Sequence, residues 1–140
     1  MDALGVEPRW LDVTRLDLSH LGLGKTIVHL TDLHYRGNRA WLESILEVTR
    51  SEKPDLVCFT GDLVDRKETE HLAEAADLLK TVGAPVYGVI GNHDPYGPDS
   101  VEIFRSIGKA TGGAWLLDEV VDVVDAADTS DTVLMGFSRV

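Results

Sequence analysis

The chain has 140 residues, and its hydrophobic fraction of 44% and charged fraction of 26% are ordinary values for a globular protein that is soluble in water, whereas its formal net charge is −11. The acidic excess argues against a broad nucleic-acid-binding surface, because phosphate backbones are held mainly by lysine and arginine. The longest apolar runs are too short to span a bilayer, and no signal peptide is visible. We expect a cytoplasmic or membrane-peripheral protein, with any membrane association coming from a segment outside this sequence. The sequence leaves the oligomeric state open.

Three short apolar runs predict strands that are buried on both faces. They span residues 26–31, 56–60 and 86–90. Runs without regular polar alternation suit a parallel sheet that is covered by helices. The sequence therefore favours an α/β fold.

Two stretches with helical periodicity separate these three runs. In the first stretch, Asn38 is placed to cap a helix and Pro54 marks its exit. In the second stretch, apolar residues recur at helical spacing between residues 72 and 82, and Gly83 is placed as a stop. Strands that alternate with helices predict right-handed parallel crossovers.

The pattern changes after the third run. A third helix is expected to start near Pro98 and to end at Gly108. Three short strands are then expected, at residues 114–117, 120–124 and 132–137. The acidic stretch 125–131 is expected to be a hairpin loop, and residues 10–18 partly alternate as an edge strand would. No linker is visible, so residues 1–140 are expected to form a single domain or part of one.

Each of the three apolar runs ends in a polar cluster. Asp32 and His34 follow the first run, Asp62 follows the second, and Asn92 and His93 follow the third. Ligands of open parallel sheets bind beyond the carboxyl ends of the strands, so these side chains are expected at one edge. Carboxylate, imidazole and amide ligands suit Mn, Fe, Zn or Co. A carboxylate that bridges two such cations would help to activate a water and to clamp phosphoryl oxygens.

The chain resembles the calcineurin-like metallophosphoesterase family through three ordered motifs: Asp32-Leu33-His34, Gly61-Asp62-Leu63-Val64-Asp65 and Gly91-Asn92-His93-Asp94. The family pattern is D-x-H, G-D-x-x-D and G-N-H-[D/E]. The resemblance runs from about residue 7 to residue 140 and is strongest to small bacterial phosphoesterases, some of them membrane-associated. It implies part of an αββα sandwich, in which parallel strands with crossover helices are followed by short antiparallel strands.

The resemblance also implies a ligand set for two divalent metal ions. Asp32 and His34 would bind the first ion, Asp62 would bridge both ions, and Asn92 would bind the second. The implied reaction is the hydrolysis of a phosphate mono- or diester by a metal-bound hydroxide.

The remaining motif residues receive catalytic and binding roles from the same resemblance. His93 would stabilise the transition state or protonate the leaving oxygen, a task that suits a near-neutral pKa. Asp65 would orient His93, and Arg66 would contact a phosphate oxygen of the substrate. Asp94 is expected to be a local turn acid and not a metal ligand.

The later histidine ligands of the family have no counterpart here, because no histidine follows His93. We therefore expect the chain to be the N-terminal half of a longer enzyme, with a natural short homologue as the alternative. The second ion would have only Asp62 and Asn92, so the isolated chain is expected to be inactive or weakly active. The alternative function is a non-catalytic scaffold of the same fold that binds metal or another protein.

Overall fold

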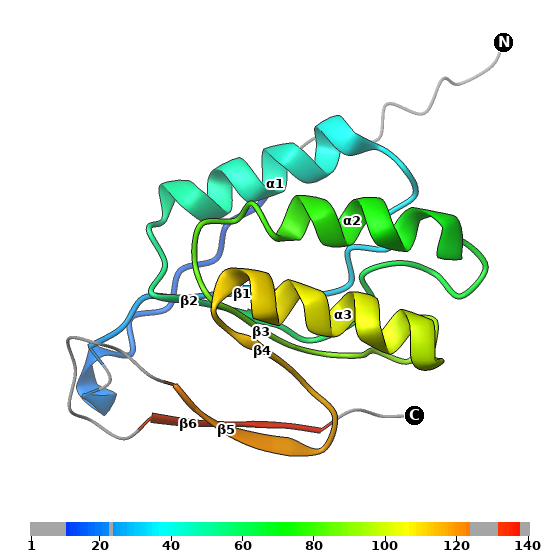
Figure 1. The fold of residues 1–140 in the computed structure, drawn as a ribbon. Helices are drawn as coiled ribbons and strands as arrows, with labels where there is room; N and C mark the ends of the chain where they lie inside the picture. The colour runs from blue at the N-terminus through cyan, green and yellow to red at the C-terminus, as the bar shows by residue number, and fades with distance from the viewer. Residues whose placement is uncertain (1–10, 23, 124–131, 138–140) are drawn as a thin grey trace, which may run out of the picture.

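The computed structural model describes residues 11–22, 24–123 and 132–137, and its centre is a four-stranded parallel sheet (Figure 1). The strands lie in the order β1 (Ile27–Leu30), β2 (Leu56–Phe59), β3 (Val86–Val89) and β4 (Ala114–Leu116). The connecting helices are α1 (Arg39–Ser51), α2 (Leu72–Leu79) and α3 (Pro98–Thr111). Each crossover moves one strand further in the same direction, so right-handed connections place all three helices on one face of the sheet, as Figure 1 shows.

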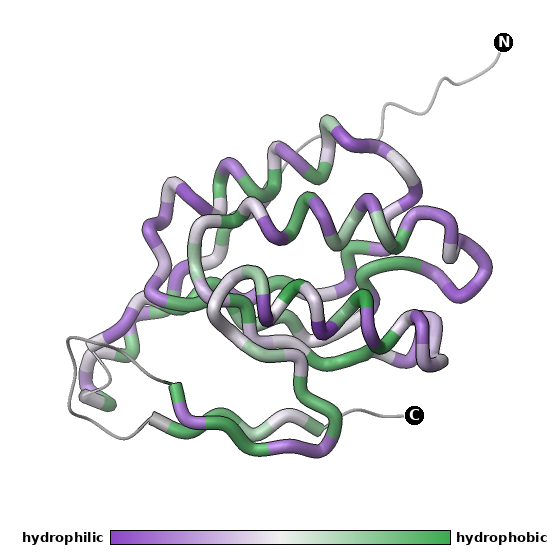
Figure 2. The backbone as a smooth tube through the Cα atoms, in the orientation of Figure 1, coloured by the Kyte–Doolittle hydropathy of each residue, from purple (hydrophilic) through white to green (hydrophobic). Residues whose placement is uncertain are grey.

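The main hydrophobic core lies between the sheet and this helical layer. Figure 2 shows hydrophobic residues along the strands and hydrophobic and hydrophilic residues alternating along the helices. Trp115 of β4 stacks on Phe104 of α3, with ring centroids 5.1 Å apart. Gly88 of β3 makes room for this indole, because a Cβ at that position would lie 2.7 Å from the ring. The β-to-α packing therefore depends on a glycine in the middle of a strand.

The strands β1, β2 and β3 form where the apolar runs predict them, each slightly shorter than its run, and β2 and β3 are largely buried. The prediction that the first strand is buried on both faces is wrong, because Ile27 and His29 of β1 are exposed and Val28 and Leu30 are only partly buried. The first of the later strands, β4, is parallel and extends the main sheet. The antiparallel part consists of β5 (Glu119–Val123) and β6 (Thr132–Gly136). Gly136 packs this pair against the main sheet, since a Cβ there would lie 2.4 Å from Leu116 and 2.9 Å from Val89. The predicted loop at residues 125–131 lies outside the described residues.

The predicted starts of α1 after Asn38 and of α3 at Pro98 are confirmed, whereas the predicted helix ends at Gly83 and Gly108 differ from the structure. Asn38 caps α1, because its side-chain oxygen accepts a hydrogen bond from the Trp41 backbone N–H at 3.1 Å. The predicted end of the third helix at Gly108 is wrong, because α3 continues to a left-handed cap at Gly112. Gly108 lies inside α3, where a Cβ would come within 2.6 Å of the backbone of Ala114. Close packing of the helix on β4, and not chain reversal, explains this glycine.

Other helical turns are short. Two 3-10 helices, each one turn long, occur among the described residues: η1 (Ser19–Leu21) and η2 (Thr69–His71). The helix α2 ends at Leu79, four residues before Gly83, and single turns carry the chain between them. Gly83 therefore marks the turn into β3 and does not cap the helix. No helix among the described residues is long and apolar enough to cross a membrane.

The predicted edge strand before β1 is wrong for the part of it that the structure describes. Residues 11–18 form no strand, and every one of their side chains is exposed. A strand gains stability from a face packed against its neighbours, and this segment has none.

On the face of the sheet away from the helices, Ile27 of β1 is 45% exposed and the His29 ring hydrogen-bonds to Thr60 at 2.7 Å. Among the described residues, this face is open beside β1.

Candidate metal centre

The loops that follow β1 and β2 run side by side at the carboxyl edge of the sheet. Three backbone hydrogen bonds join them, from Asp32 N to Gly61 O (3.1 Å), from His34 N to Asp62 O (2.9 Å) and from Tyr35 N to Leu63 O (2.8 Å). These bonds continue the parallel pairing beyond the ends of the strands. The D-x-H and G-D motifs are therefore fixed relative to each other by the main chain.

The loop after β3 approaches the second loop just as closely. A Cβ on Gly61 would lie 2.5 Å from the Cα of Gly91, and a Cβ on Gly91 would lie 2.2 Å from Oδ1 of Asp62. Glycine is needed at both positions because no larger residue fits this contact. The Asp62 Oδ1 atom then accepts a hydrogen bond from the backbone N–H of His93 at 2.8 Å.

Three side chains at this edge have the spacing of metal ligands. Oδ atoms of Asp32 and Asp62 and a ring nitrogen of His34 all lie within 4.8 Å of one another. The His34 Nε2 atom is 4.0 Å from Asp32 Oδ1 and 4.0 Å from Asp62 Oδ2. A cation that holds each donor at about 2.1 Å allows donors up to about 4.2 Å apart. Both His34 distances fall below this limit, so the donor types and these two separations fit one divalent cation, and we call these three residues the metal triad.

All three residues of the metal triad have backbone conformations that side-chain-bearing residues rarely adopt. Their φ angles are 54° for Asp32, 42° for His34 and 60° for Asp62. Left-handed conformations of such residues cost roughly 1–3 kcal/mol each and collect at functional sites. Among the described residues, only Lys53 and Asp118 share this feature. The fold maintains strain at three of the four positions where the sequence predicts ligands, with Asn92 as the exception.

Asp94 holds the second and third loops together. Its side chain is fully buried and accepts hydrogen bonds from the backbone N–H groups of Asp62 (2.8 Å), Val64 (3.1 Å) and Gly91 (2.9 Å). Burial raises the pKa of the Asp94 carboxyl, and these three bonds oppose that rise. Only the Gly91 bond is the local turn contact that the sequence predicts. The two bonds to the other loop were not predictable, and the only signal for them is an acid placed directly after Gly-Asn-His.

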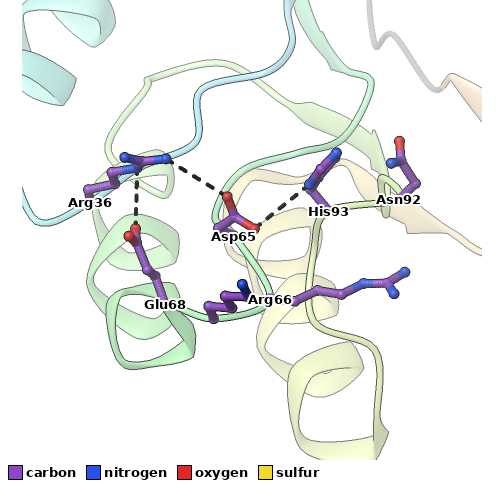
Figure 3. A pocket seen from close by; sticks show the side chains of 7 residues that line it. Arg36, Asp65, Arg66, Glu68, Asn92 and His93 are labelled. Carbon is purple, nitrogen blue, oxygen red and sulfur yellow. Dashed lines mark ion pairs between the residues drawn. The ribbon is translucent and has the colours of Figure 1, made fainter.

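Asp65 lies between the two histidines of the site. Its Oδ1 atom is 3.7 Å from Nδ1 of His93, and its Oδ2 atom is 3.9 Å from Nδ1 of His34 (Figure 3 shows the first pair). The two imidazole rings are 5.3 Å apart at their centroids. These separations exceed hydrogen-bond distance, and such contacts often shorten only when substrate is bound. Asp65 also lies 3.9 Å from Arg36, so one carboxylate contacts three nitrogen-bearing side chains.

A cavity of about 650 Å³ opens beside these residues. It is lined by Arg36, Asp65, Arg66, Lys67, Glu68, Asn92 and His93. Three residues with predicted roles, His93, Asn92 and Arg66, therefore face one space, and Asp65 connects that space to the metal triad. The second metal position, with Asp62 and Asn92 as ligands, stays a prediction.

The chain also matches known proteins. Residues 25–137 match the family described as calcineurin-like phosphoesterase. UDP-2,3-diacylglucosamine pyrophosphatase LpxG of Chlamydia muridarum is 34% identical over 99 residues, which cover 64% of this chain and 30% of the relative. The metallophosphoesterase YkuE of Bacillus subtilis is 32% identical over 95 residues, covering 64% of this chain and 32% of the relative.

A protein of Arcobacter nitrofigilis named "Probable glycerophosphodiester phosphodiesterase GpdQ" is 35% identical over 72 residues, which cover 51% of this chain and 25% of the relative. The chain therefore spans about a third or less of the length of these relatives. The match to the family extends over most of the chain and includes all three loops of the candidate site. The chain belongs to the calcineurin-like phosphoesterase family.

Proposed function

We propose that this chain provides the metal triad and the acid–base pair of an enzyme that hydrolyses phosphate mono- or diesters. The observation that carries the proposal is the ligand spacing of Asp32, His34 and Asp62 at three strained backbone positions. When bound, divalent cations supply an activated water and positive charge for the phosphoryl oxygens. We propose that the site binds two such ions and that Asn92 is a ligand of the second ion.

The two oxygens of Asp62 have different surroundings. Oδ1 accepts the His93 N–H, whereas Oδ2 faces the His34 ring at 4.0 Å. Oδ2 is therefore the oxygen that is better placed to bind a metal ion. Oδ1 fixes the orientation of the carboxylate through its hydrogen bond to His93. Because Asp62 is only 7% exposed, its charge is little screened by solvent, which strengthens its attraction for a cation.

His93 is proposed to donate a proton to the leaving oxygen, and Asp65 to orient its ring. The His93 side chain is exposed and lines the cavity, so a substrate can reach it. The Asp65 carboxylate on its Nδ1 side would leave Nε2 free to face substrate. General acid catalysis by a positioned imidazole contributes typically 10²–10⁴-fold to a rate.

Metal binding by the 140-residue chain is the direct test of the triad. We expect calorimetry to show weak binding of one Mn²⁺ per chain and Asp62→Asn to abolish it. Asp77→Asn removes an exposed carboxylate that is paired with Lys80 and should leave binding unchanged. Metal binding that survives Asp62→Asn would refute this ligand assignment.

Hydrolysis is tested with nitrophenyl phosphate mono- and diesters and Mn²⁺ on the protein as its gene encodes it. Loss of turnover in Asp62→Asn, with Asp77→Asn unaffected, is the expected result. A non-catalytic scaffold is the second candidate. It is favoured because the metal triad is the one group of three or more possible histidine, cysteine or carboxylate ligands among the described residues. The number of metal ions bound by the protein as its gene encodes it separates the two functions. Two ions per protein favour the enzyme, and none favours the scaffold.

A further inference from the structure

The cavity beside the metal triad carries positive charge, although the chain as a whole is strongly acidic. Its lining contains the cations Arg36, Arg66 and Lys67 and the carboxylates Asp65 and Glu68, in a chain with a net charge of −11. Both carboxylates pair with Arg36, which lies 3.9 Å from Asp65 and 3.6 Å from Glu68. The three cations therefore exceed the two carboxylates by one charge, and Arg66 and Lys67 are the two cations of the lining that are not paired with either carboxylate.

Neither Arg66 nor Lys67 forms an ion pair within the described part of the chain. Both side chains are exposed, so each can move to meet a ligand. Among the described residues, Arg50, Lys53 and Lys109 also form no ion pair, but none of these three cations lines the cavity. Two adjacent cations at a cavity raise the local concentration of anionic ligands.

These two cations lie on the substrate side of the candidate site. His93 lines the same cavity, and Asp65 lies between His93 and His34 of the metal triad. Figure 3 shows Arg66 extending along the side of the cavity where Asn92 and His93 lie, with Arg36 on the other side. A volume of about 650 Å³ is that of a site for a whole small ligand, and much more than one phosphoryl group fills.

We propose that Arg66 and Lys67 bind a second phosphoryl group of the substrate, so that the preferred substrates carry two phosphoryl groups. The reacting phosphoryl group would lie at the metal triad and the second one in the cavity. Guanidinium binds phosphate through paired hydrogen bonds and ammonium acts as a point charge, so the two side chains complement each other. This inference rests on the proposed function and adds a substrate class to it.

Calorimetry with two non-hydrolysable probes tests the proposal on the 140-residue chain. Methylenediphosphonate carries two phosphonyl groups and methylphosphonate carries one, and both are used in excess Mg²⁺. We expect the wild-type chain to bind the diphosphonate about tenfold more tightly, the effect of one charge-assisted hydrogen bond. Arg66→Ala and Lys67→Ala should each reduce that ratio and leave methylphosphonate binding unchanged.

Lys109→Ala is the matched control, because it removes one exposed cation of α3 that does not line the cavity. It should keep the wild-type ratio. A wild-type chain without preference for the diphosphonate would overturn the proposal, and so would Arg66 and Lys67 variants that keep the preference or that weaken both probes equally. The binding ratio needs no turnover, so it can fail while ester hydrolysis persists. Absence of hydrolysis would contradict the proposed function instead.

Discussion

The Asp94 carboxylate accepts a hydrogen bond from the backbone N–H of Asp62, which belongs to the metal triad. In return, Asp62 Oδ1 accepts the N–H of His93, the neighbour of Asp94. Each acid thus fixes the loop that carries the other. The orientation of Asp62 consequently depends on a buried residue that would bind neither metal nor substrate.

Asp94→Ala should destabilise the fold and weaken metal binding together. The substitution would leave the backbone N–H groups of Asp62, Val64 and Gly91 without their acceptor. Each buried unsatisfied donor costs about 1–3 kcal/mol, so a loss of roughly 3 kcal/mol is expected in urea unfolding. Asp94→Asn keeps one acceptor oxygen and should lose less. Equal stability of Asp94→Ala and wild type would contradict this role.

Gly91→Ala should weaken Mn²⁺ binding by more than tenfold. The added Cβ would lie 2.2 Å from Oδ1 and 2.4 Å from the backbone N of Asp62, so the carboxylate has to move. Gly97→Ala is the control, because a Cβ there meets nothing within 4 Å and the backbone is extended. Calorimetric titration of both variants provides the comparison, and similar affinities for the two would count against close packing as the cause.

His93→Ala should lower kcat while metal binding persists. Its ring is placed to move a proton, and no predicted metal ligand changes, so a loss of about 10²–10⁴-fold is expected. Asp65→Asn should give a smaller loss of kcat, because it changes the group beside Nδ1 that orients the ring and leaves the ring itself in place. Substitution of the exposed His20 should change neither quantity. Metal loss in His93→Ala would reassign this residue as a ligand.

Cys58 should react slowly with iodoacetamide in the folded chain. It lies half-buried on β2, and burial raises the pKa of its thiol, so less thiolate is present at pH 8 than in an unfolded chain. The folded state favours the neutral thiol, so its stability contribution is present at neutral pH. That contribution is lost as the pH rises past the ordinary thiol pKa towards the folded one. Alkylation rates measured from pH 7 to 10, with and without urea, check both statements.

The sequence predicts the part of the fold that depends on local patterns. Short runs rich in apolar residues identify β1, β2 and β3, and Asn38 followed by an apolar stripe identifies the start of α1. The three motifs are found because each follows one of these strands, and parallel strands bring their carboxyl ends together. Asp32, His34 and Asp62 could therefore be grouped without coordinates.

Long-range contacts are what the sequence does not reveal. Gly108 has the signature of a helix end, and only the packing of α3 on β4 explains why it lies inside the helix. Asp94 follows His93 as a turn acid would, whereas two of its three partners are about 30 residues away along the chain. The pairing of Arg36 with both cavity carboxylates, which leaves Arg66 and Lys67 without an ion pair to any residue that the structure describes, also depends on the fold.

The unbroken strand order has a consequence for how the chain is made. In neighbouring strands, Ile27 pairs with Leu56, Val57 with Val86 and Tyr87 with Ala114. The paired residues are fewer than 30 positions apart in the sequence, so the next strand is synthesised soon after its partner. On the ribosome, the sheet can grow by one unit at a time, since no early strand depends on a distant one. The three ligand-bearing loops would thus meet as soon as β3 has left the exit tunnel.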